Sequence, residues 1–280
     1  MPLLILLLAA LLPIIWLLRD PLFTGWRRSR VRRQPFPPAW RQTLRERVPY
    51  FRSMPADLQL QLKKHIQVFL AEKPFIGCGG LVVTDEMRVT IAAQACLLIL
   101  NRRGDYFANL RQILVYPGAF VVDKVHADGS GVLQDQRRVL AGESWQQGQV
   151  ILSWQDAVDG AGVPDDGRNV VIHEFAHQLD FLDGTTNGTP PLATEAEEER
   201  WATVMTAALA AHRRDLDRRR REPTFFSEQA GDDETEFFAD ASEAFFCRPH
   251  DLHGEAPEVY ELLLGYYGVD PRRWFGGQPK

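Results

Sequence analysis

The chain has 280 residues, of which 45% are hydrophobic and 25% charged, and this composition excludes collagen-like, low-complexity and disulfide-scaffold proteins. Its three cysteines lie far apart, with no pair at metal-ligand spacing, which suits a reducing compartment. The formal net charge is −5, but residues 19–52 hold ten arginines against two acids, so residues 53–280 carry −13. An acidic body of this kind predicts that no nucleic acid is bound.

An apolar run opens the sequence. Residues 3–18 have no charged or polar side chain, and as a helix they would extend about 24 Å, close to the thickness of a bilayer core. A cleaved signal peptide, an uncleaved anchor and a buried core helix are the three interpretations. Basic residues follow the run instead of preceding it, which favours an anchor with the body in the cytoplasm. We predict a transmembrane helix within residues 1–20 and a location at the inner (cytoplasmic) membrane, with a cytoplasmic protein as the alternative.

The next segment, residues 21–47, is basic and contains the proline-rich stretch 34–40. We expect it to be a linker whose arginines serve mainly as an orientation signal, and binding of anionic lipid is the sharper interpretation. The folded domain is predicted to start near residues 47–50 and to cover residues 48–280.

The body mixes helices and strands. Hydrophobic periodicity, capping residues and charge patterns predict helices over residues 55–72, 84–100 and 194–221. Short β-rich runs predict strands over residues 112–116, 120–123 and 149–154. Because strands and helices do not alternate regularly, the pattern favours an α+β fold.

One segment contains a possible metal-binding motif. Residues 168–181 predict a mostly buried helix, on which His173 and His177 are four residues apart. Both rings then project from one helix face and can hold a single ion, and neutral imidazoles suit Zn²⁺. Bound zinc lowers the pKa of its water toward about 7. Glu174, next to the first histidine, would take the proton from that water and pass it to the leaving amine.

Catalytic zinc needs a third protein ligand. Residues 234–246 predict an otherwise apolar helix with Glu236, Asp240 and Glu243 on one face, and the alternative is a merely solvated helix face. We predict Glu236 as the ligand, and Asp240 or Glu243 as the acceptor for the far nitrogen of a ligand histidine. Other histidines rank lower as ligands because none lies in a comparably apolar segment: His126, His212, His250 and His253.

Several stretches together resemble the Mlc titration factor A family of zinc peptidases, from about residue 55 to 270. They are TDEMRVTIAAQACLLIL, VYPGAFVVD, SWQQGQVILSWQD, VIHEFAHQLDFLDG and EFFADASEAFF. The resemblance implies a zincin-like (gluzincin) metallopeptidase domain, and one zinc ion held by His173, His177 and Glu236, with Glu174 as base. It also implies aminopeptidase activity on small peptide substrates and a regulatory protein partner, since the best-studied member binds a transcriptional repressor in the cytoplasm.

Two features depart from the family pattern. The family has a tyrosine seven residues before the glutamate ligand, as a donor to the transition-state oxyanion, and this chain has Gln229 there. Loss of one oxyanion donor costs about 2.7–4 kcal/mol, so we expect weaker activity or a different substrate. The second departure, the apolar run at 3–18, sets the chain apart from the soluble member that binds the repressor. A zinc peptidase remains the prediction; a regulatory protein that sequesters a partner and a non-peptide zinc hydrolase are the alternatives.

Overall fold

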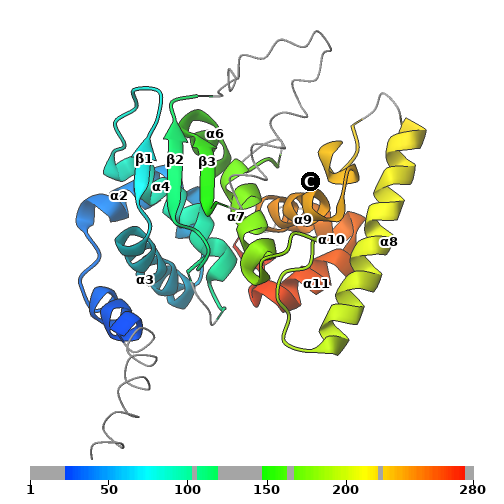
Figure 1. Cartoon of the computed structure of the whole chain (residues 1–280), viewed down its shortest axis with the longest axis horizontal. Helices are drawn as coiled ribbons and strands as arrows, with labels where there is room; N and C mark the ends of the chain where they lie inside the picture. Colours follow the sequence, from blue (N-terminus) through cyan, green and yellow to red (C-terminus); the bar gives the residue numbers. More distant parts are fainter. Residues whose placement is uncertain (1–22, 103–105, 119–146, 163–166, 220–222, 275–280) are drawn as a thin grey trace, which may run out of the picture.

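A computed structural model of the chain describes residues 23–102, 106–118, 147–162, 167–219 and 223–274. It shows a mixed helical and sheet fold (Figure 1). The strands are β1 (Phe75–Gly77), β2 (Gln112–Tyr116) and β3 (Gln149–Ser153). The helices are α2 (Pro38–Arg47), α3 (Ala56–Glu72), α4 (Asp85–Ala95), α6 (Trp154–Ala161), α7 (Val170–Asp180), α8 (Glu195–Arg219), α9 (Glu234–Cys247), α10 (Pro249–Glu255) and α11 (Pro257–Tyr267). Short 3-10 turns are η1 (Pro49–Arg52), η2 (Cys96–Ile99), η3 (Phe181–Asp183), η4 (Gln229–Gly231) and η5 (Pro271–Arg273).

The three described strands form one parallel sheet in the order β1-β2-β3. Ile113 of β2 pairs with Phe75 of β1 and with Val150 of β3. Parallel neighbours need a crossover connection, and α4 supplies it between β1 and β2. The strands predicted over 112–116 and 149–154 are confirmed as β2 and β3. The sequence did not predict β1, which has three residues and ends in a glycine.

Helix α4 lies at the centre of the sheet half of the molecule, where it packs against α2, α3, α6 and α7. Its residues from Val89 to Ala95 are all buried, as expected for a helix that is apolar on nearly all sides. A cluster of aromatic rings then joins α3 to α7. The ring of Phe107 lies 4.8 Å from Phe175 and 6.1 Å from Phe69, so the helix that carries the two predicted histidine ligands rests on the core.

The second half of the molecule is helical. Helix α9 lies beside α7 on one side, and α8 and α11 pack against it as well (Figure 1). Trp201 of α8 is buried between Phe238 of α9 and Tyr266 of α11, at ring distances of 5.5 and 5.3 Å. This packing confirms the helix predicted over 234–246 and, as far as residue 219, the helix predicted over 194–221, and it fixes α9 against α7.

The segment predicted to be a linker, residues 21–47, is folded against the body wherever the structure describes it. Residues 23–32 are helical, and α2 packs against α4 with Leu44 fully buried. Arg28 pairs with Glu72 at 2.8 Å, and Arg47 pairs with Glu86 at 2.6 Å. The partners of these arginines lie on α3 and α4, far away in sequence. The balance of charges within residues 21–47 therefore could not indicate these ion pairs. The folded body therefore extends at least to residue 23.

The predicted anchor, residues 1–20 with the apolar run 3–18, lies outside the described residues, as do the strand predicted over 120–123 and His126. In the part of the chain that the structure describes, no helix is both long enough and apolar enough to cross a membrane.

Candidate metal centre

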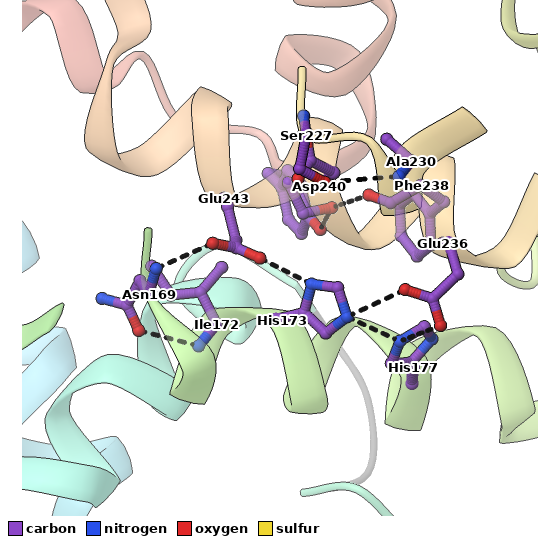
Figure 2. A network of polar contacts seen from close by, with 12 residues as sticks. Asn169, Ile172, His173, His177, Ser227, Ala230, Glu236, Phe238, Asp240 and Glu243 are labelled. Atoms are coloured by element: carbon purple, nitrogen blue, oxygen red, sulfur yellow. Dashed lines mark hydrogen bonds and ion pairs between the residues drawn. The ribbon is translucent and has the colours of Figure 1, made fainter. Parts of the chain in front are cut away.

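Helix α7 begins at a cap that its sequence provides. The side chain of Asn169 accepts a hydrogen bond from the backbone N–H of Ile172 at 3.0 Å and donates to the carbonyl of Gly160 at 2.8 Å. Asparagine is among the best N-cap residues because its side chain satisfies one of the free N–H groups of the first turn. The apolar side of the helix is buried, and His173 and His177 project toward α9 (Figure 2).

Helix α9 brings the acids to the same place. Asp233 caps it by accepting from the backbone N–H of Glu236 at 2.8 Å, and its phenylalanines are buried. Glu236 and Glu243 are seven residues apart, about two turns, and both carboxylates point toward α7 (Figure 2). The two helices therefore face each other with histidines on one and carboxylates on the other.

Three predicted ligands meet in this space. Nε2 of His173 lies 3.1 Å from Nε2 of His177 and 3.3 Å from a carboxylate oxygen of Glu236. Nε2 of His177 lies 3.8 Å from the other oxygen of that carboxylate. One ligand atom from each residue lies within 4.8 Å of the others, and among the described residues this is the grouping of three potential ligands that could hold a metal ion.

The donor set fits zinc. Two nitrogens at about 2.0–2.1 Å from one tetrahedral zinc ion lie about 3.4 Å apart, close to the separation found here. Two imidazole nitrogens and a carboxylate crowd lone pairs together, and a cation between them removes the repulsion. His177 is fully buried, whereas the side chains of His173 and Glu236 keep 21% and 15% of their surface exposed. The cluster is thus open on one side, as a catalytic metal site requires.

The two histidines differ in their affinity for protons. Burial, and then the charge of His173, lower the pKa of His177 to about 3, so this ring is neutral and ready to act as a ligand. Burial also lowers the pKa of His173, but hydrogen bonds to Glu236 and Glu243 outweigh it and raise the pKa well above its usual value. A proton and a metal ion therefore compete for Nε2 of His173, and metal binding releases the proton.

Glu243, one of the two acids predicted to support a ligand histidine, holds His173 in place. One of its oxygens lies 2.5 Å from Nδ1 of His173, and the other accepts from the backbone N–H of Asn169 at 2.7 Å. Burial raises the pKa of this carboxyl, and the contact with His173 opposes the rise. Because Nδ1–H donates to Glu243, the lone pair of Nε2 is directed into the cluster.

Asp240, the other acid predicted to support a ligand histidine, has a different partner. Its carboxylate accepts from the backbone N–H of Ser227 at 3.1 Å and so holds the segment that precedes α9 (Figure 2).

Asn169 was not identified from the sequence, although an asparagine just before an apolar helical run is a recognisable cap signal. The hydrogen bond from its backbone N–H to Glu243 joins positions that are 74 residues apart, and no local pattern in the sequence indicates it.

The remaining predicted residues surround the cluster less directly. Glu174 follows His173 on α7 and is half-buried, and Gln229 begins η4, a turn that packs against α8 and α9. His212, ranked low as a ligand, donates instead to the carbonyl of Ser227 at 2.8 Å. His253 packs against the ring of Tyr260. Neither His212, His250 nor His253 belongs to the three-ligand grouping among the described residues.

Comparison with known proteins agrees with this site. The glucose-regulated metallo-peptidase M90 family matches residues 23–268, a longer stretch than the resemblance seen in the sequence, and it includes the folded N-terminal helices. An uncharacterized protein of Synechocystis sp. is 36% identical over 252 residues, which are 90% of this chain and 91% of that protein. Mlc titration factor A of Yersinia enterocolitica is 30% identical over 240 residues (84% and 88%), and that of Escherichia fergusonii 29% over 246 residues (88% and 91%). The chain belongs to the glucose-regulated metallo-peptidase M90 family, together with the Mlc titration factor A proteins.

Proposed function

We propose that this chain is a zinc-dependent aminopeptidase that hydrolyses small peptides with a metal-activated water. The observation that carries the proposal is the convergence of His173, His177 and Glu236 next to Glu174, at an opening to solvent. Membership of a metallopeptidase family supports the reaction type. The aminopeptidase character rests on the resemblance of the sequence to the Mlc titration factor A family.

In this proposal, His173, His177 and Glu236 would hold the zinc ion, which would supply a Lewis acid for the reacting water and the scissile carbonyl. Glu174 would accept the proton of the attacking water and pass it to the leaving amine. Glu243 keeps the ring of His173 oriented by accepting from Nδ1–H. Gln229 stands where the family has a tyrosine, and its side-chain amide is the candidate donor to the carbonyl oxygen of the scissile bond.

The sheet supplies a place for the substrate backbone. Among the described strands β3 lies at one edge of the sheet, and it packs against α7, which carries both histidines. An extended peptide that pairs with this edge would lie along α7. Main-chain pairing binds peptides with little dependence on their side chains, so it suits a peptidase that acts on short substrates.

A second candidate function is regulatory binding, in which the chain sequesters a protein partner such as a transcriptional repressor. It is favoured by the name of two relatives, Mlc titration factor A. We also propose that residues 3–18 tether the chain to the inner membrane with the catalytic domain in the cytoplasm. This location rests on the apolar run and on the arginines that follow it.

The test is made on the full chain, because residues 23–47 pack against the body. Zinc content is measured by elemental analysis, and hydrolysis is measured on a panel of amino-acid anilides and quenched peptides. We expect about one zinc per chain, turnover in the wild type and its loss in Glu174→Gln, with zinc retained. Glu198→Gln, an exposed acid on α8, is the matched control and keeps full activity. Zinc without turnover on any substrate would instead support the binding function, and full activity in Glu174→Gln would refute the assignment of the base.

A further inference from the structure

A basic cavity lies in the α2–α3 part of the molecule, remote from the metal centre. It has a volume of about 700 Å³ and lies between α2, η1 and α3. Figure 1 shows α2 and α3 in the half of the molecule that contains the sheet, and α9 in the other half. Six residues line the cavity: Arg41, Arg45, Phe51, Arg52, Gln59 and Lys63. Four of these side chains are cationic, and none is acidic.

The local structure forces these cations together. Arg41 and Arg45 are one turn apart on α2 and therefore share a face. Pro49 begins the 3-10 turn η1, which carries Arg52 back under α2, where its guanidinium donates to the carbonyl of Arg45 at 2.9 Å. Lys63 enters from α3 on the other side. Arg41, Arg45 and Arg52 are exposed, and like charges at such spacing repel one another weakly; an anion bound between them would replace this repulsion by attraction.

Nearby arginines behave differently. Arg28 pairs with Glu72, Arg47 with Glu86 and Arg88 with Asp85, at 2.8, 2.6 and 3.1 Å. In the described part of the chain, by contrast, the four cations of the cavity form no ion pair with a carboxylate. Glu46, the acid on α2, accepts a hydrogen bond from Gln42.

Burial and the excess of positive charge in the cavity change the pKa of Lys63. Burial, and then the charge of Arg41, lower the pKa of its ammonium group below the usual value. A bound anion would act in the opposite direction and restore the lysine's affinity for its proton. The buried ring of Phe51 forms an apolar wall of the cavity.

We propose that this cavity binds a phosphate group, carried either by a soluble phosphate compound or by the headgroup of an anionic phospholipid. Guanidinium groups present paired N–H donors that match two phosphate oxygens, and the compact ammonium group of a lysine adds a point charge. Three guanidinium groups and one ammonium group exceed what a single carboxylate can satisfy. Because the cavity is in the other half of the molecule from α9, the ligand acts as an anchor or a regulator and not as part of the peptide substrate.

The experiment uses the full chain and two probes. Binding of pyrophosphate is measured by calorimetry. Binding to vesicles is measured by co-sedimentation, comparing phosphatidylcholine alone with phosphatidylcholine plus phosphatidylglycerol, so that attachment through apolar residues is common to both vesicles. The variant Arg41→Gln/Arg45→Gln removes two cations from the cavity. Arg214→Gln/Arg218→Gln, on α8, makes the same change of net charge at exposed positions elsewhere and is the matched control.

We expect the cavity variant to weaken the binding of one probe at least tenfold, and the control to change it less than twofold. Loss of pyrophosphate binding identifies a soluble ligand, and loss of only the phosphatidylglycerol-dependent binding identifies a lipid headgroup. If neither probe binds, or if the cavity variant binds both as the wild type does, the proposal is wrong. Should the double variant unfold, Lys63→Gln on α3 makes the same test without altering α2.

Discussion

Glu243 and Asn169 are hydrogen-bonded at 2.7 Å, carboxylate oxygen to backbone N–H, although 74 residues separate them in the chain. The bond joins the start of the motif helix α7 to the middle of α9. The other oxygen of the same carboxylate holds Nδ1 of His173. One buried side chain thus fixes both the distance between the two helices and the orientation of a metal ligand.

We therefore predict that Glu243→Gln weakens zinc affinity about 10–100-fold, the usual cost of losing a partner of a ligand histidine. A carboxylate accepts from both Asn169 N–H and His173 Nδ1–H, whereas an amide has only one oxygen and turns its NH₂ group toward one of these donors. The measurement is competition for zinc with a chelator of known affinity. Asp240→Asn is the matched control, because an amide oxygen can still accept from Ser227, and equal losses in both variants would argue against a specific role for Glu243.

A second prediction concerns the loop that leads away from α7. Gly188 has a φ of +72°, its N–H donates to the buried Asp180 at 3.0 Å, and its carbonyl accepts from the indole of Trp201 at 2.9 Å. A Cβ added there would lie 2.3 Å from the carbonyl oxygen of Glu234, in the first turn of α9. Gly188→Ala must therefore displace the backbone two residues before the ligand Glu236.

Gly184→Ala is its matched control, since Gly184 has a φ of +91° but no atom within 4 Å of an added Cβ. We expect Gly184→Ala to lower the free energy of unfolding by about 1–2 kcal/mol, the cost of a left-handed alanine, and to leave zinc affinity unchanged. Gly188→Ala should cost more and also weaken zinc binding. Denaturant unfolding and zinc competition measure the two effects, and similar zinc affinities in both variants would contradict the link from the loop to Glu236.

Much of the metal centre was predictable because its residues lie at short, regular spacings in the sequence. Two histidines four residues apart must share a helix face, and a helix that buries phenylalanines while it carries Glu236 needs a partner for the carboxylate. Spacing alone could not choose between Asp240 and Glu243, since both lie on the same face as Glu236. The choice depends on how far along α9 the start of α7 lies, which only the tertiary structure shows.

The N-terminal helices were missed for a related reason. Prolines, and arginines with few acids near them in the sequence, are typical of a linker, and residues 21–47 contain both. Glu72, the partner of Arg28, lies 44 residues further along the chain, and Glu86, the partner of Arg47, lies 39 residues further along. Strand β1 was missed because three residues are too few to show a period of two.

The last prediction concerns acid stability, through a histidine outside the metal centre. Nε2 of His65 donates to the carbonyl of Leu100 at 3.1 Å, so Nδ1 accepts from the hydroxyl of Tyr106 at 2.8 Å. Burial lowers the pKa of His65 to about 4; the bond to Leu100 opposes this shift, and the charge of Arg32 adds to it. The folded state therefore favours the neutral ring.

Since the pKa in the folded state is below the unfolded value of about 6.5, His65 stabilises the fold fully above that pH. The contribution, up to about 3 kcal/mol, is lost as the pH falls from about 6.5 to about 4. His65→Gln removes this titration, so its free energy of unfolding should fall less than that of the wild type between about pH 7 and about pH 4.5. Urea unfolding of the wild type and of His65→Gln at the two pH values measures this effect. The titration of the metal ligands is common to both proteins and cancels when they are compared. His253→Gln, at an exposed histidine, should keep the pH dependence of the wild type, and an unchanged dependence in His65→Gln would show that His65 is not the titrating group.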